Sequence, residues 1–474
     1  MSTREFCAPR LMQESYNMKL IFYGGVEGLV TGANYMLDTG DFKFLVDCGL
    51  AQGSKYADSL NYEPFKYNPA EIKYVLVTHS HVDHMGRLPK LYKDGFRGRV
   101  LTTTATRDLT IASLPDTQNR ITEDAKLHGV EPLYDEAEMN GLIELLEGFD
   151  YEKQIDLGSG VKITFRDAGH ILGSSIIEVA YPTESGSYRK IFFSGDLGNP
   201  PTPLLRTTEF VEDADYVVIE SAYGDRIHED RSKRKEKLTS IIVETIKQGG
   251  TLMIPSFALE RTQELLFELN GLVNNKVIPQ IPVFVDSPLA IKLTEVYEKH
   301  AEYFNTNSNY LINSGDDIFK FPMLKFTPSV DESKHINDVP PPKIIIAGAG
   351  MSNGGRILHH ELRYLSDPKS TILFVGYQVQ GSLGRRILDG AKEVSIFHQQ
   401  VAVNCRVDAI GGYSAHADQL GLLKWVKVAN TNKLLKKVFV VQGEVSAVSI
   451  LAQKIKDDLD IEAVIPKAEE GFDL

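Results

Sequence analysis

The stretch "YVLVTHSHVDHMGRLP", residues 74–89, places four potential metal ligands within six positions. These are His79, His81, Asp83 and His84, and they follow an apolar run that is typical of a buried strand. A single histidine among apolar residues is more often a hydrogen-bonded core residue than a ligand. Several ionisable groups packed together are costly to bury unless a cation holds them. The spacing therefore predicts a metal site.

Two further apolar runs end in residues of the same kind. The segment "ITFRDAGHILGSS" supplies His170, and "IFFSGDLGN" supplies Asp196. In a layered fold, strand ends at one edge of a sheet can converge on one site. We expect two ligand sets with Asp196 between them: His79, His81 and His170 for one ion, and Asp83 with His84 for the other.

The ligand types indicate which metal and which chemistry to expect. Imidazole and carboxylate groups suit zinc best, and manganese or iron also fit. Two divalent ions about 3.5–4 Å apart lower the pKa of a bridging water toward about 7 and brace an in-line displacement. The expected reaction is hydrolysis by a metal-bridging hydroxide. Cys7, Cys48 and Cys405 lack C-x-x-C spacing and predict neither a disulfide framework nor a cysteine-built zinc site.

The composition is that of an ordinary globular protein. With 474 residues, of which 42% are hydrophobic and 24% charged, the chain can form two or three domains. No apolar run reaches the length of about 18 residues that a membrane span needs, and the start "MSTREFCAPRLMQESYN" lacks the apolar segment of a secretory signal. We therefore expect a cytoplasmic protein without a membrane partner. The net charge of −13 would repel nucleic acid at long range, so such a substrate would need a local groove.

The pattern of elements changes along the chain. The first half contains strand-like runs such as "MKLIFYGG" and "VKITFRDAG", with a helical stretch around residues 105–146, and predicts a strand-rich layer of mixed α and β structure. From about residue 220, strands alternate with helices, which is typical of parallel βαβ units and predicts a second domain. The helix "EKLTSIIVETIKQGG" is expected to present one apolar face, formed by Leu238, Ile241, Ile242 and Ile246.

Four motifs in order, "FLVDCG", "THSHVDHMG", "GHILGSS" and "FSGDLG", resemble those of the metallo-β-lactamase superfamily. The resemblance implies an α/β fold, an αββα sandwich with the metals at one edge. It also implies that Asp47 supports the metal ligands without binding metal itself. The alternative for Asp47 is a turn residue beside Gly49. The superfamily contains lactamases, thioesterase-like enzymes and nucleases, so this fold alone does not select a substrate.

The second half resembles the β-CASP branch of that superfamily, whose members act on nucleic acids. The resemblance is carried by "YVVIESAYGDR", "PSFALERTQELL", "VDSPLA", "GAGMSNGGRILHH", "GYQVQGSLGRRILDG" and "GGYSAHADQ". It implies an inserted β-CASP domain at 215–405, a parallel sheet flanked by helices, between metallo-β-lactamase parts at 1–214 and 406–474. The chain is similar to bacterial and archaeal relatives of the endonuclease subunit of the cleavage and polyadenylation specificity factor. Relatives with this architecture often form dimers, so a homodimer is expected.

Within this resemblance, Glu220 of "IESAYG" and His416 of "YSAHAD" match motifs in which a carboxylate orients an imidazole. The imidazole is placed to protonate the leaving oxygen, and a histidine tuned near neutral pH suits that role. Asp83 is expected to belong to the same catalytic group. The alternatives are a turn acid at a strand end for Glu220 and a surface-loop histidine for His416.

One residue departs from the family pattern. In "KVFVVQGEVSA", Gln442 stands where the family has a histidine that completes the second metal site. An amide carbonyl is neutral and binds zinc more weakly than imidazole does. A weaker second site, a changed metal preference and a loss of activity are all open outcomes.

Several side chains are candidates for contacts with RNA phosphates. The glycine-rich segment "AGAGMSNGGR" could offer backbone N–H groups, and arginine forks pair well with phosphates. The alternatives are a close-packed turn and ion-paired helix faces. The basic run "RSKRKEK" at 231–237 is interpreted as a solvated helix start. The candidates are Arg261, Ser352, Asn353, Arg356, Arg385 and Arg386.

The sequence thus predicts a zinc-dependent ribonuclease that hydrolyses single-stranded RNA as an endonuclease, a 5′-3′ exonuclease or both. The main alternative is a catalytically impaired RNA-binding or scaffold protein of the same fold, because Gln442 replaces the expected ligand. A hydrolase of small molecules is disfavoured, since the inserted domain would then have no purpose.

Overall fold

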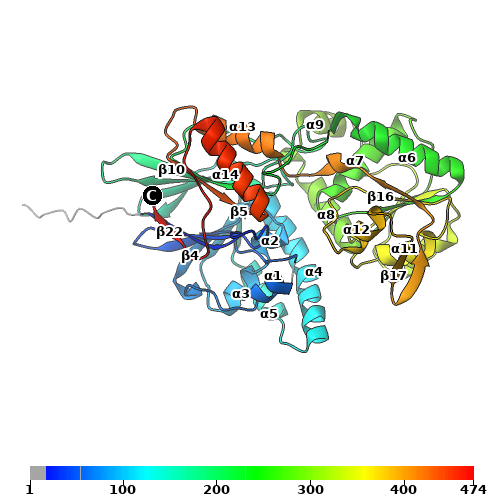
Figure 1. Ribbon diagram of the computed structural model, residues 1–474, viewed down its shortest axis with the longest axis horizontal. Helices are drawn as coiled ribbons and strands as arrows, with labels where there is room; N and C mark the ends of the chain where they lie inside the picture. The colour runs from blue at the N-terminus through cyan, green and yellow to red at the C-terminus, as the bar shows by residue number, and fades with distance from the viewer. Residues whose placement is uncertain (1–17, 54, 230) are drawn as a thin grey trace, which may run out of the picture.

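In the computed structural model the chain forms two lobes that lie side by side along the longest axis (Figure 1). The structure describes residues 18–53, 55–229 and 231–474. Cys7, the N-terminal segment and the start of the expected domain at 1–214 lie outside these residues. Within the described ranges, no helix combines the length and the apolar character that a membrane span requires.

The first lobe contains two seven-stranded sheets that pack face to face over a core containing Phe22, Phe165 and Phe193. In spatial order, the first sheet consists of β22 (Gly471–Asp473), β1 (Lys19–Gly24), β2 (Asn34–Asp38), β3 (Lys43–Val46), β4 (Ile72–Leu76), β5 (Arg99–Thr103) and β6 (Leu146–Phe149). The second consists of β21 (Ala463–Val464), β20 (Lys437–Val441), β11 (Tyr216–Glu220), β10 (Tyr188–Phe193), β9 (Ser175–Pro182), β8 (Val161–Asp167) and β7 (Ile155–Gly158).

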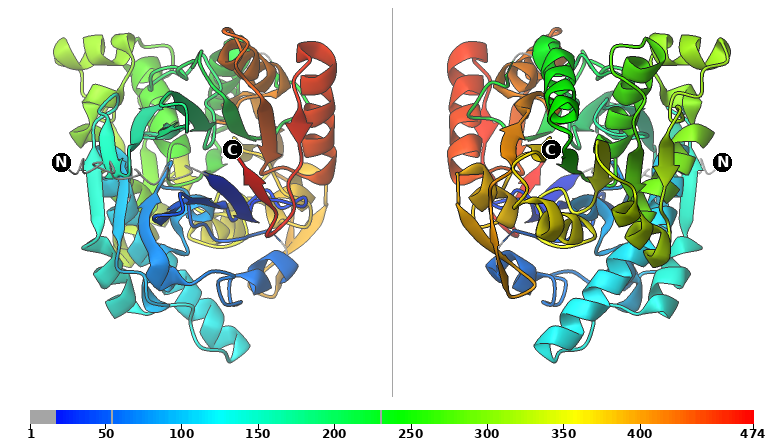
Figure 2. Two further views of the ribbon diagram at one scale, coloured as in Figure 1. Left: turned by 90° about the vertical axis from the view of Figure 1, so that its left-hand side faces the viewer. Right: turned by 90° about the vertical axis from the view of Figure 1, so that its right-hand side faces the viewer.

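Helices cover the outer face of each sheet (Figures 1 and 2). Leu91 packs with Val100 of the first sheet, and Trp425 packs with Val440 of the second. The helices of this lobe are α1 (Lys55–Leu60), α2 (Val82–Met85), α3 (Leu88–Lys93), α4 (Thr104–His128) and α5 (Glu136–Ile143) on the first sheet, and α13 (Gln419–Ala429) and α14 (Val445–Leu459) on the second. The expected αββα sandwich is confirmed.

The second lobe is built on a six-stranded sheet whose neighbouring strands all run parallel. Its order is β14 (Leu324–Phe326), β13 (Val283–Asp286), β15 (Lys343–Ala347), β12 (Thr251–Pro255), β16 (Thr371–Phe374) and β19 (Arg406–Ala409). A hairpin of β17 (Glu393–Ile396) and β18 (Gln399–Ala402) lies apart from it. The helices are α6 (Arg234–Gln248), α7 (Arg261–Asn274), α8 (Pro288–Lys299), α9 (Thr306–Asn313), α10 (Val330–His335), α11 (Ile357–Tyr364) and α12 (Leu383–Leu388).

Helix α6 illustrates how the sequence forms this lobe. Leu238, Ile241 and Ile242 recur at helical spacing and are buried in the core of the lobe, so the predicted apolar face packs inward. The helix ends at Gly249, whose φ of 68° is the left-handed conformation that glycine adopts without steric cost. The parallel βαβ organisation expected for this part of the chain is therefore confirmed.

The chain changes sheets at residues other than those expected. Strand β11, expected in the β-CASP part, pairs with β10 and β20 of the first lobe. Strand β19, expected after that part, pairs with β16 of the second lobe. The boundaries at 214/215 and 405/406 are thus each displaced by one strand from the points where the sheets change. A short apolar run such as "YVVIE" forms a strand but does not specify which sheet it joins.

Two arginines of the basic run at 231–237 lie in the contact between the lobes, where a solvated helix start was expected. Arg234 is buried, and its Nη2 lies 2.6 Å from Oε1 of Glu268. Its Nη1 donates to the carbonyl of Gly412 over 3.3 Å, and Nε of Arg231 donates to the same carbonyl over 2.8 Å. These bonds attach the loop just before His416 to the second lobe.

We predict that Phe165→Ala lowers the free energy of unfolding by about 3–5 kcal/mol, because the ring is fully buried between the sheets and its removal leaves a cavity. Leu127→Ala is the control, since Leu127 is 81% exposed and its truncation should change stability by less than about 0.5 kcal/mol. Denaturant titration measures both variants. Equal losses would contradict this assignment of the core.

Candidate metal centre

The predicted site residues gather at one edge of the sandwich because each follows the carboxyl end of a strand. The first sheet contributes the turns after β3 and β4, and the second contributes those after β8, β10, β11 and β20. The sheets face each other, so these turns converge. The residues at or within three positions of the strand ends are Asp47, His79, His170, Asp196, Glu220 and Gln442.

Three histidines and one aspartate form the tightest group at this edge. Nε2 of His79 lies 3.0 Å from Nδ1 of His81, which lies 3.2 Å from Nε2 of His170. Oδ2 of Asp196 lies 3.3 Å from Nε2 of His79 and 3.5 Å from Nε2 of His170. One potential ligand atom from each of the four residues lies within 4.8 Å of the others. This arrangement fits a single divalent cation.

The protonation states at this group also suit a metal. Burial lowers the pKa of His81 and of His170 well below the ordinary value, and neighbouring imidazoles lower it further. Burial opposes the charge of Asp196, but His84 and His79 outweigh it and hold the pKa of that carboxyl well below its usual range. Neutral imidazoles and an ionised carboxylate are the forms that bind zinc.

The second expected ligand set is less compact. Nε2 of His84 lies 3.3 Å from Oδ1 of Asp196 but 3.9 Å from Oδ2 of Asp83. Among the described residues, the groups of three or more side chains close enough to share an ion include neither Asp83 nor His84. The side chains expected to hold a second ion therefore do not converge as those of the first group do.

Gln442 is buried directly against His84. Its amide nitrogen lies 2.9 Å from Nε2 of His84, and its amide oxygen accepts a hydrogen bond of 3.0 Å from the hydroxyl of Tyr35. The backbone of Gln442 is also fixed, since its N–H donates to the carbonyl of Gly25 over 2.7 Å. A second ion would need the same nitrogen of His84, so this position does not fit a fully liganded second cation.

Asp47 binds the far side of the same imidazole. Its Oδ2 lies 2.8 Å from Nδ1 of His84, and the hydroxyl of Thr78 donates to Oδ2 over 2.9 Å. The Thr78 hydroxyl also lies 3.0 Å from Nδ1 of His79. Asp47 and Thr78 therefore orient two rings from behind, which is the position that the resemblance implies for Asp47.

Glu220 and His416 form a pair beside the metal group. Nδ1 of His416 lies 3.1 Å from Oε2 of Glu220, whose other oxygen accepts a hydrogen bond of 2.6 Å from the N–H of Leu197. The His416 side chain is 29% exposed, so it can reach a bound molecule. Burial opposes its charge, but Glu220 and then Asp196 outweigh that cost and raise the pKa of His416 to about 9.

Two residues of this site, Thr78 and Tyr35, were not expected from the sequence. Thr78 immediately precedes His79, and its hydroxyl position in "VTHSH" was a local signal that could have been used. Tyr35 lies 407 positions from Gln442, and nothing in "NYMLD" distinguishes its ring from a core side chain.

Two of the expected RNA-binding residues face the interior. Arg261 is buried, with its guanidinium near the carbonyl of Val375 and 5.6 Å from the ring centre of Tyr413. Ser352 is fully buried and donates to Glu361. Neither side chain faces solvent in this structure.

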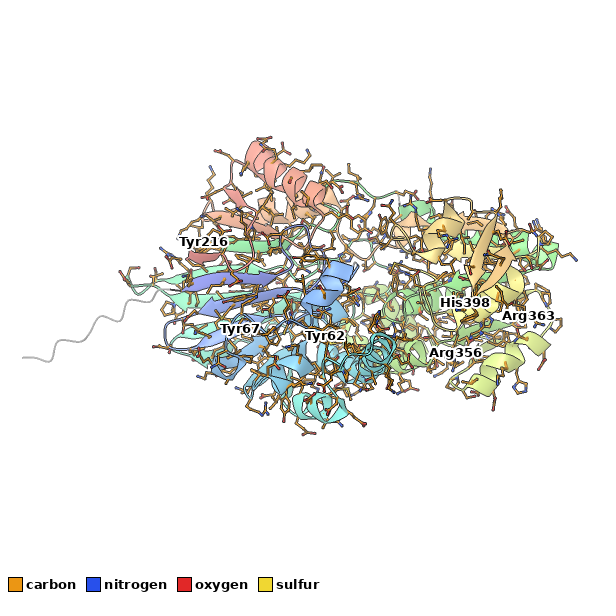
Figure 3. All side chains as sticks on the ribbon, turned by 60° about the horizontal axis from the view of Figure 1, so that its bottom comes forward. Tyr62, Tyr67, Tyr216, Arg356, Arg363 and His398 are labelled. Atoms are coloured by element: carbon orange, nitrogen blue, oxygen red, sulfur yellow. The ribbon has the colours of Figure 1, made fainter. Side chains whose placement is uncertain are left out.

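The other four candidates lie nearer the surface of the second lobe. Arg356, labelled in Figure 3, binds Asp286 over 2.8 Å and two backbone carbonyls. Asn353 accepts a hydrogen bond at the start of α12, and Arg385 of that helix pairs with Asp389, which directly follows it. Arg386 is exposed. The structure does not bring these residues into the metal group, so any role they have concerns the RNA strand away from the cluster.

Three family profiles match the chain. The profile described as the metallo-beta-lactamase superfamily matches residues 28–96, that of the Beta-Casp domain matches 262–387, and that of the Zn-dependent metallo-hydrolase RNA specificity domain matches 400–466. A ribonuclease of Thermus thermophilus is 35% identical over 86% of this chain and 91% of its own length. The chain belongs to the β-CASP branch of the metallo-β-lactamase superfamily.

Further relatives extend over most of this β-CASP chain. An RNase J-like protein of Methanocaldococcus jannaschii is 30% identical over 94% of this chain and 97% of its own length. The transcription termination factor FttA of Methanosarcina mazei is 31% identical over 90% of this chain and 67% of its own length. A solved protein of unknown function from Enterococcus faecalis shares the fold, with a TM-score of 0.57 at 12% identity, covering 97% of this chain and 100% of that one. The family resemblance of the motifs is confirmed.

In the metal-free protein, we predict that His416 titrates near pH 9 and that Glu220→Gln lowers this value, because the carboxylate stabilises the imidazolium. Since the folded pKa is above the ordinary 6.5, the stabilisation by this ion pair is complete below pH 6.5 and is lost as the pH rises through about 9. NMR of the His416 ring measures the titration. Glu298→Gln serves as the control, and an unchanged pKa in Glu220→Gln would contradict the pairing.

Proposed function

We propose that this β-CASP protein is a metal-dependent ribonuclease that hydrolyses phosphodiester bonds of single-stranded RNA. The observation that carries the proposal is the cluster of His79, His81, His170 and Asp196, which lies directly beside the Glu220–His416 pair. His416 joins the two groups, since its Nδ1 is 3.8 Å from Oδ2 of Asp196. The names of the ribonuclease and RNase J-like relatives support RNA as the substrate.

Zinc is the ion that we propose for the cluster, since three imidazoles and one carboxylate are ligands that zinc prefers. When bound, such a cation supplies Lewis acidity and lowers the pKa of water. The protein contributes the orientation of its ligands. Thr78 fixes the ring of His79, and the carbonyl of Ala415 lies 3.2 Å from Nδ1 of His170.

The Glu220–His416 pair supplies the proton for the leaving group in this proposal. Hydrolysis breaks the bond between phosphorus and the ribose O3′, and that oxygen must gain a proton as it departs. His416 is exposed enough to reach that oxygen, and the carboxylate of Glu220 beside its Nδ1 favours the protonated ring. Glu220 holds Nδ1, which leaves Nε2 as the atom that donates the proton.

We predict that zinc-loaded protein cleaves a 5′-labelled single-stranded RNA, and that chelation or His81→Ala abolishes cleavage because the cluster then lacks its ion or one ligand. Gel analysis of the products measures this, and their lengths distinguish internal cutting from trimming at the end. Leu127→Ala is the control for effects of substitution and purification that do not concern the cluster. Full activity of His81→Ala would contradict the proposal.

The number of metal ions that the site can hold depends on the residue at position 442. We propose that the cluster holds one firmly bound ion and that the second position binds a cation weakly or not at all. The amide nitrogen of Gln442 contacts Nε2 of His84, and its amide oxygen accepts a hydrogen bond from Tyr35. This buried hydrogen-bond network takes the place of the second cation. The two zinc ions expected from the family pattern would then require a histidine at 442.

We predict one tightly bound zinc per chain in the wild type and two in Gln442→His, measured by elemental analysis after gel filtration. The φ of Gln442 is 50°, a conformation that histidine adopts more readily than most residues, so the substitution should be tolerated. Gln399→His on the β17–β18 hairpin controls for an added histidine outside the site. Two ions in the wild type, or one in Gln442→His, would contradict the proposal.

If the protein is instead an RNA-binding or scaffold protein without activity, the same experiments should give different results. If the wild type binds RNA without cleaving it and Gln442→His cleaves it, the missing ligand is the cause and the natural protein is an RNA-binding relative of the enzymes. A homodimer and a cytoplasmic location stay predictions from sequence, which light scattering and cell fractionation would check.

A further inference from the structure

Phe257 is an exposed aromatic residue at the edge of the second lobe where the parallel strands end. It follows the carboxyl end of β12, which lies between β15 and β16 in the parallel sheet, and it is 42% exposed. Open parallel sheets bind their ligands outside the carboxyl ends of their strands. Phe257 therefore stands where a ligand of this sheet would bind.

The neighbouring strands leave room for the ring. Gly350 follows β15 and Gly376 follows β16, and a Cβ added at these positions would lie 2.8 Å and 3.2 Å from Phe257 ring carbons. The ring thus rests against the backbone of two glycines, and any larger residue there would displace it. One side of the ring is supported by backbone while the exposed part is left uncovered.

A second aromatic residue extends this surface toward the metal centre. Tyr377 directly follows Gly376 and is 51% exposed. A Cβ added at Gly376 would lie 3.6 Å from Nη1 of Arg261, whose guanidinium is 5.6 Å from the ring centre of Tyr413, three residues before His416. Phe257 and Tyr377 therefore lie on the side of the second lobe that approaches His416.

The chemistry of this surface matches an unpaired nucleobase. Exposed aromatic rings stack on bases, because every base has a flat π-face. The guanidinium groups of Arg226 and Arg385 are paired with Asp225 and Asp389, so this surface offers stacking and not net positive charge. A base inside a duplex cannot present its face to a protein ring, so such a surface selects single strands.

We propose that Phe257 and Tyr377 form a base-stacking platform that holds an unpaired base of the RNA strand next to the scissile phosphate. This inference rests on the proposed ribonuclease function and specifies how that function selects its substrate. Phe257 acts by binding and takes no part in bond cleavage.

The first test measures binding of a labelled single-stranded RNA of about 12 nucleotides to the full chain in chelator, so that the RNA is not cut. Phe257→Ala should weaken binding by about 10- to 100-fold, while Phe257→Trp should retain it, because loss of a stacked base costs that much and tryptophan also stacks. Phe397→Ala is the matched control: Phe397 is 47% exposed at the turn of the β17–β18 hairpin and should have no effect. Unchanged binding by Phe257→Ala would overturn the proposal.

The second test separates stacking from a general loss of structure. RNAs with one abasic nucleotide at successive positions should bind the wild type more weakly at one position only, and that dependence should disappear in Phe257→Ala. The salt dependence of binding should stay the same in Phe257→Ala, because no phosphate contact is removed. If the wild type shows no position at which the base matters, the platform is overturned.

The third test separates the platform from the proposed function. Zinc-loaded Phe257→Ala should cleave an RNA that is abasic at the sensitive position as fast as the wild type does at saturating RNA, since this substrate has no base to stack there. Failure of the wild type to cleave any RNA would overturn the ribonuclease function, and the binding data would still decide the platform. Slower cleavage of the abasic RNA by Phe257→Ala than by the wild type would overturn the platform.

Discussion

One buried carboxylate faces the ring nitrogens of four histidines at the edge of the sandwich. The nearest distances from Asp196 range from 3.3 to 3.8 Å, and the partners are His79, His84, His170 and His416. Such a concentration of ionisable groups is unfavourable in a protein interior unless charge is balanced. The two sheets, the turns after their strands and the attachment of the second lobe are all needed to build it, because the five residues come from four separate turns.

Much of this arrangement could be predicted because the signals are local. The run "HSHVDH" places ligands two and three residues apart, and strand ends explain why His170 and Asp196 join them. Hydrogen-bond partners drawn from the core could not be predicted in this way. Tyr35 has the pattern of a strand residue, and only the packing of the sheets brings its hydroxyl to Gln442.

In the second lobe, residue type alone did not predict which side chains are accessible to RNA. Arginine and serine were expected to meet phosphate, yet Arg261 and Ser352 point into the lobe, because a helix or a turn has an inner face that composition does not reveal. The aromatic surface at Phe257 was not expected, since "PSFALE" ends a buried strand and an aromatic residue there predicts core. The glycines against which the ring packs, Gly350 and Gly376, follow two other strands of the sheet, so the sequence around Phe257 does not reveal this arrangement.

The path of the chain has a consequence for synthesis. Strands β1 to β11 of the first lobe are synthesised before the chain enters the second lobe, whereas His416 comes only after the whole second lobe, in a loop anchored to that lobe by Arg231 and Arg234. An emerging polypeptide therefore contains His79, His81, His170 and Asp196 while it still lacks His416, the proton donor of the proposed reaction. The order of translation keeps an unfinished chain beside its own messenger without the complete pair of Glu220 and His416.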